Sequence, residues 1–73
     1  MNDYKDKFSA DYVYFLGFAT GMWSVLIDLM EKNILEVFLK GALFALLNEE
    51  PFSHLPKDFA AVVYKDFIKA SCI

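Results

Sequence analysis

The pattern of apolar and polar residues divides the chain into helical segments and one clear break. Residues 9–31 hold aromatics, leucines and alanines, with no proline and no period-two alternation, which predicts a helix. Residues 32–48 continue as an amphipathic helix. Two nearby prolines then predict a turn over residues 49–56. Residues 57–70 place their apolar side chains mainly on one side, which predicts a short amphipathic helix and an all-α protein.

Two patterns compete where the first two helical segments meet. Asn33 followed by Glu36 has the spacing of a capping box, which would start a new helix. Charges of alternating sign cross the same junction at i,i+4 spacing and favour an unbroken helix (Asp28, Lys32, Glu36 and Lys40). We therefore expect one long N-terminal helix over residues 9–48. The alternative is two consecutive helices, at about 9–31 and 34–48.

Residues 12–27 carry no charge on any face of this helix. As a helix they span roughly 24 Å, close to the ~30 Å hydrocarbon core of a bilayer, and Leu29 and Met30 extend the run. The prediction is a single transmembrane span within residues 9–31. The alternative is a helix buried on all sides inside a protein assembly, because such a helix also needs apolar residues on every face.

Small and bulky side chains separate onto opposite faces of this segment at about 100° per residue. The small face predicts a helix-packing interface, and it includes the Gly-x-x-x-Gly spacing that lets helices approach closely (Ala10, Gly17, Gly21, Ser24 and Asp28). The bulky face is then expected to meet lipid tails (Phe8, Tyr12, Phe15, Met22, Leu26 and Met30).

Composition limits the classes of partner. The 73 residues form a single small helical unit with a polar N-terminus over residues 1–8, and 58% of them are apolar. Net charge is −3 and arginine is absent, so no basic surface is available for nucleic acid. Cys72 is the only cysteine, which excludes a disulfide within the chain. A chain this short with this much apolar surface needs lipid or other protein subunits to cover it.

Candidate chemistry is sparse. Asp28 at the edge of a membrane segment could carry protons, but pairing with Lys32 is the simpler interpretation. His54 with Glu49 and Glu50 makes a poor zinc ligand set. We therefore expect no catalytic residue, no metal, no cofactor and no small-molecule substrate.

These observations predict a non-enzymatic accessory membrane subunit that docks by helix packing in a larger multi-subunit complex. By analogy, the first guess is a respiratory-type organellar complex in the mitochondrial inner membrane. The alternative is a minor capsid or scaffold protein that cements a virion. A proton-translocating subunit that uses Asp28 is the third hypothesis.

Overall fold

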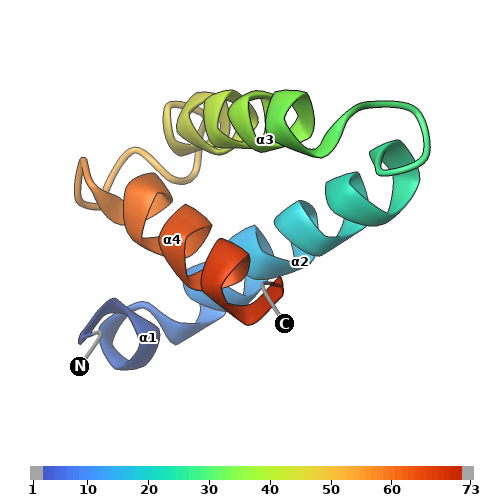
Figure 1. Cartoon of the computed structure of the whole chain (residues 1–73). Coiled ribbons are helices and arrows are strands. Elements are labelled where there is room, and N and C mark those ends of the chain that lie inside the picture. The colour runs from blue at the N-terminus through green and yellow to red at the C-terminus, as the bar shows by residue number, and fades with distance from the viewer. Residues whose placement is uncertain (1–2, 72–73) are drawn as a thin grey trace.

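The computed structural model describes residues 3–71, and within that range it consists of four helices and no strand (Figure 1). The helices are α1 (Asp3–Lys7), α2 (Ser9–Leu26), α3 (Lys32–Leu47) and α4 (Phe59–Ser71). α2 and α3 converge at their short connection and diverge toward their other ends, and α4 packs against both of them (Figure 1). The all-α prediction is confirmed.

The expected continuous helix over residues 9–48 is wrong, because the chain turns between α2 and α3. The backbone amides of Leu29 and Met30 both donate to the carbonyl of Leu26, at 2.9 and 3.0 Å. Glu31 then adopts an extended conformation, with φ −65° and ψ 147°, and α3 begins at the next residue. The two-helix alternative is correct, although α2 ends five residues before the predicted residue 31.

Tertiary burial explains why the helix breaks here. Every fourth residue of α3 is a buried leucine (Leu35, Leu39, Leu43 and Leu47). Burying one leucine side chain contributes about 1.5–3 kcal/mol, whereas each i,i+4 charge pair contributes about 0.2–0.5 kcal/mol. Folding α3 back along the chain covers the leucines, so it outweighs the charge ladder that favours a continuous helix.

The predicted transmembrane span falls on α2, which holds 18 residues. Within residues 3–71, no helix combines the length and the apolarity that crossing a bilayer requires.

Phe15 is at the centre of the core. Its side chain is fully buried, and its ring meets the rings of Phe52 and Phe59 edge-on, at centroid distances of 5.1 and 5.0 Å. Tyr12 is buried in the same cluster, and Met22 packs against it. The bulky face of α2 was expected to meet lipid, but its central residues instead cover the core of their own chain.

The segments outside the long helices also differ in detail from the prediction. Residues 3–7 of the expected polar N-terminus form α1. The predicted turn over residues 49–56 is present, and Phe52 and Leu55 within it are buried. The last helix begins at residue 59, two residues later than expected. The turn therefore contributes core residues as well as a reversal of direction.

Two tyrosine–aspartate hydrogen bonds attach the N-terminal helices to α4 and to Asp58, the residue just before it. Tyr4 donates its hydroxyl to Asp58 at 2.7 Å, and Tyr12 donates to Asp66 at 2.5 Å. The tyrosines are eight residues apart in the sequence, and so are the aspartates. The first bond is exposed and the second is partly buried. The pair therefore fixes the position of α4 along α1 and α2.

We expect Tyr12→Phe to lower the free energy of unfolding by about 1–2 kcal/mol, because hydrogen bonds to charged groups are stronger than neutral ones and Asp66 would lose this donor. Tyr4→Phe is the matched control and should cost about 0.5 kcal/mol or less, since water replaces the hydroxyl at the exposed site. Urea denaturation measures both. Equal losses for the two variants would contradict this account.

Candidate docking surface

α3 is apolar on two opposite faces. The leucine stripe points into the core, and a second series of apolar and small residues lies on the other side. We name this second series the α3 outer stripe (Ile34, Val37, Phe38, Gly41, Phe44 and Ala45). Its spacing of i, i+3, i+4, i+7, i+10 and i+11 keeps it on one helix face.

The large side chains of the α3 outer stripe are open to solvent. Val37 is 73% exposed, Phe38 51% and Ile34 50%. A surface helix of a globular protein normally carries one apolar stripe, with polar residues opposite it. A helix with apolar residues on both faces is typical of one that is covered on both sides. The second stripe is therefore a candidate docking surface.

The polar residues in the middle of α3 lie on the flank that faces α4. Lys40 places its ammonium 6.0 Å from the centroid of the Tyr64 ring. Burial, together with the nearby Glu36 carboxylate, raises the pKa of Tyr64. Because Glu36 and Lys40 both face α4, they leave the outer stripe uncharged.

The predicted packing residues of α2 form a second exposed surface, which we name the α2 outer face (Ala10, Gly17, Gly21 and Ser24). A Cβ atom added at Gly17 or Gly21 would meet nothing within 4 Å, so none of the described helices packs there. The Ser24 hydroxyl donates to the carbonyl of Thr20 at 2.6 Å within the same helix. Docking of a partner on this face stays a prediction.

Asp28 is set apart from the other predicted interface residues. It lies in the turn that follows α2 and is exposed. Its predicted ion pair with Lys32 is not formed: the ion pair identified within residues 3–71 joins His54 and Asp11 instead. The turn breaks the i,i+4 geometry that the Asp28–Lys32 pair needed.

Sequence reasoning missed the α3 outer stripe, although the signal was present. The charged residues of the ladder mark only one flank of this segment. The interleaved apolar positions, with leucines at 35, 39, 43 and 47 and a second series from Ile34 to Ala45, already described a helix with two apolar faces.

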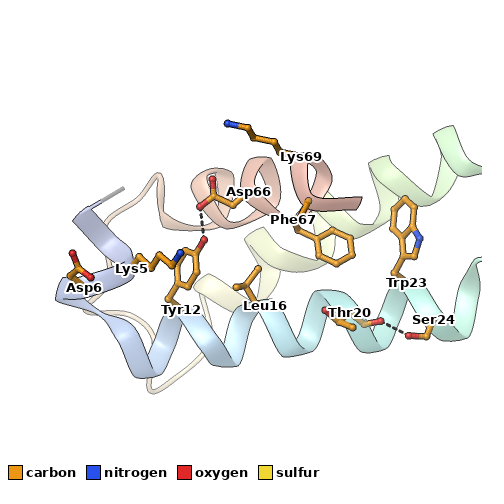
Figure 2. Close-up of a pocket in the computed structure, with 11 residues that line it drawn as sticks. Lys5, Asp6, Tyr12, Leu16, Thr20, Trp23, Ser24, Asp66, Phe67 and Lys69 are labelled. Atoms are coloured by element: carbon orange, nitrogen blue, oxygen red, sulfur yellow. Dashed lines mark hydrogen bonds between the residues drawn. The ribbon is translucent and has the colours of Figure 1, made fainter. Parts of the chain in front are cut away.

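A groove between α1, α2 and α4 is the second surface feature of interest (Figure 2). Leu16, Trp23 and Phe67 line its apolar part, with the Trp23 and Phe67 rings 5.6 Å apart. Figure 2 shows the Tyr12 hydroxyl directed at Asp66 across this groove. Its central polar groups therefore already bond to their own chain, which favours a structural role.

The residues considered for metal binding are dispersed. His54 is more than half exposed, and its ring nitrogens lie 2.8 Å from the Pro51 carbonyl and 3.3 Å from Asp11. Glu50 accepts a hydrogen bond from Ser53. Across residues 3–71, no three potential ligand side chains gather closely enough to hold a metal ion. Cys72 lies outside the described residues.

Comparison with protein-family models, with curated proteins and with solved structures finds no match to this chain.

The empty space around the helical glycines predicts that alanine at these positions stabilises the fold. We expect Gly21→Ala and Gly41→Ala each to raise the free energy of unfolding by about 0.5–1 kcal/mol. Alanine loses less entropy than glycine in a helix, and its methyl group meets no atom at either position. Thermal and urea unfolding measure the change. A loss of stability at either position would mean that the backbone there packs against something within the chain.

Proposed function

We propose that this protein is a small, non-catalytic docking subunit of a larger protein assembly, which acts by packing helices against a partner. The observation that carries the proposal is the α3 outer stripe, where a helix already buried on one side exposes a second apolar face. Apolar anchors at i, i+3, i+4 and i+7 are the pattern with which a helix occupies a hydrophobic groove. The uncharged α2 outer face adds a place for close helix approach.

The size of the exposed surface supports this role. Four large apolar side chains of the α3 outer stripe expose between 36% and 73% of their surfaces (Ile34, Val37, Phe38 and Phe44). At ~150–250 Å² for a whole large side chain, this amounts to roughly 300–500 Å² on one helix face. The largest apolar patch on a typical monomer is about 300–600 Å² and is often functional, so a stripe of this size supports a docking role.

A lipid bilayer is the second candidate partner. The observation that favours it is the absence of charge from residue 12 to residue 27, which leaves the whole outer side of α2 uncharged. Against it, the exposed connection beside this run carries Asp28 and Glu31. Acidic groups at this position are costly to move into hydrocarbon and are repelled by anionic lipid surfaces.

Recovery of the native assembly tests the proposal. A tagged chain expressed in its own cells and extracted in mild detergent should sediment with larger partner proteins. Val37→Lys should shift it to the free pool, because a charge buried in an apolar contact weakens association by at least about tenfold, or 1.4 kcal/mol. Carbonate extraction of membranes separates the two candidate partners. A chain held only by protein contacts is released into the supernatant, whereas a chain embedded in lipid stays in the membrane pellet.

Ala70→Lys is the matched control, because it adds the same charge at an exposed position of α4. It should leave the tagged chain in the assembly. If both variants remain bound, the α3 outer stripe is not the docking surface. If the wild-type chain is recovered free of any partner protein, the proposed function is wrong.

A further inference from the structure

We infer that the α3 outer stripe docks into an apolar groove of a different protein, and that this groove carries basic side chains (lysine or arginine) at both of its ends. This inference rests on the proposed docking function and names the chemistry of the partner. The observation that carries it is the position of two exposed carboxylates, Glu31 and Glu49, at the two ends of the stripe.

Glu31 and Glu49 continue the spacing of the stripe beyond both of its ends. Glu31 is the residue just before α3, and it precedes Ile34 by three positions. Glu49 follows Ala45 by four positions, and its amide donates to the carbonyl of Leu46 at 3.0 Å, which continues the helical winding past the end of α3. The two acidic positions therefore lie along the same helix face as the stripe, roughly 27 Å apart at about 1.5 Å per residue.

Cations of the same chain do not neutralise these two ends. The ion pair identified within residues 3–71 is the one between His54 and Asp11. Glu31 and Glu49 therefore have no basic side chain at ion-pair distance in this part of the chain. Lys32 is next in the sequence, but it precedes the buried leucines of α3 by three and seven positions, which places it on the opposite side of the helix from the stripe. Both ends of the stripe stay acidic.

Helix stability does not explain the acidic C-terminal end. A carboxylate at the N-terminus of a helix, such as Glu31, interacts favourably with the helix dipole. Glu49 and Glu50 instead follow the C-terminus of α3, where the dipole disfavours negative charge, and the last turn of this helix contains no basic residue. A basic group on a docked partner would supply the favourable interaction that the chain itself lacks.

Charge also disfavours the other two occupants of the stripe. In an antiparallel pair of copies, Asp28 and Glu31 of one chain would lie near the acidic C-terminal end of the other α3, and parallel packing would pair each acidic end with itself. Both arrangements bring like charges together, which opposes association. An anionic lipid surface repels the same groups. An apolar groove with basic ends covers the stripe and pairs with both acidic ends.

Competition for the native assembly tests this inference. Untagged full chain displaces the tagged wild-type chain from an assembly extracted in mild detergent. At low salt, the double variant Glu31→Gln, Glu49→Gln should need about three- to thirtyfold more chain than the wild type for half displacement, as expected for the loss of two exposed ion pairs. In about 1 M sodium chloride, where the Debye length is about 3 Å, the two chains should compete equally.

Asp6→Lys is the matched control, because it changes the net charge by the same amount as the double variant. Asp6 is exposed on α1, away from α3 (Figure 1). This control should compete within about twofold of the wild type at low salt. The residues replaced in the double variant are also exposed, so its circular dichroism should match that of the wild type.

The failure of this inference is distinct from the failure of the proposed function. If the double variant competes as well as the wild type at low salt while Val37→Lys does not compete, the stripe docks on a partner without basic ends, and the inference is wrong. If Val37→Lys also competes fully, the proposed function is wrong. Dimerisation of the isolated chain through position 37 would identify a second copy as the occupant, and binding of phosphatidylcholine vesicles through this position would identify lipid. Either result overturns the basic groove.

Discussion

Replacing Phe15 by alanine should lower the free energy of unfolding by about 3–5 kcal/mol, the usual cost of removing a buried phenylalanine. The ring is fully buried and meets Phe52 and Phe59 edge-on, so the variant loses both aromatic contacts and leaves a cavity. A chain of this length is expected to have only about 4–11 kcal/mol of total stability. The variant should therefore be largely or partly unfolded at room temperature, as measured by far-ultraviolet circular dichroism in urea.

Val13→Ala is the control for this prediction, because Val13 lies in the same helix and is 67% exposed. Its effect should stay within about 0.5 kcal/mol, as for most surface substitutions. If Phe15→Ala is harmless and Val13→Ala is damaging, α2 presents its bulky face outward, as the sequence had suggested.

Leu39→Ala should cost about 2–5 kcal/mol of stability, because Leu39 is fully buried in the leucine stripe of α3. Val37→Ala, two residues earlier on the opposite face, should leave stability within about 0.5 kcal/mol of the wild type. Val37→Ala should nevertheless weaken binding of the chain to its assembly, because it removes part of the docking surface. Leu39→Ala should weaken that binding only because it partly unfolds the chain. Urea denaturation and sedimentation of the same two proteins separate these effects. Equal destabilisation would mean that both faces of α3 are part of one core.

The helical segments and the proline-containing turn could be predicted from the sequence because they depend on local preferences. The break between α2 and α3 could not be predicted in this way. Residues 27–31 contain no glycine or proline, and the local charge ladder from Asp28 to Lys40 favours continuity. The deciding contribution comes from leucines that become buried only when α3 folds back, so the break depends on contacts between residues far apart in the sequence.

The candidate site could be predicted in part. The small face of α2 is exposed, as an interface requires. The bulky residues on the opposite face of the same helix fill the core, which turns the glycines toward solvent. The assignment of that bulky face to lipid failed, because Tyr12 and Phe15 have partners in α4 and in the turn after α3. The α3 outer stripe needed the structure, since two interleaved apolar stripes resemble one uniformly apolar segment until one of them is buried.

Solvent accessibility at position 37 tests the central claim most directly. The Val37→Cys variant in a Cys72→Ser background should react rapidly with a water-soluble maleimide when the purified chain is dilute. In the native assembly, its reaction should slow at least tenfold, while Lys65→Cys on α4 reacts at the same rate in both states. Equal rates at position 37 in the dilute chain and in the assembly would show that the α3 outer stripe remains in water, and would contradict its assignment as the docking surface.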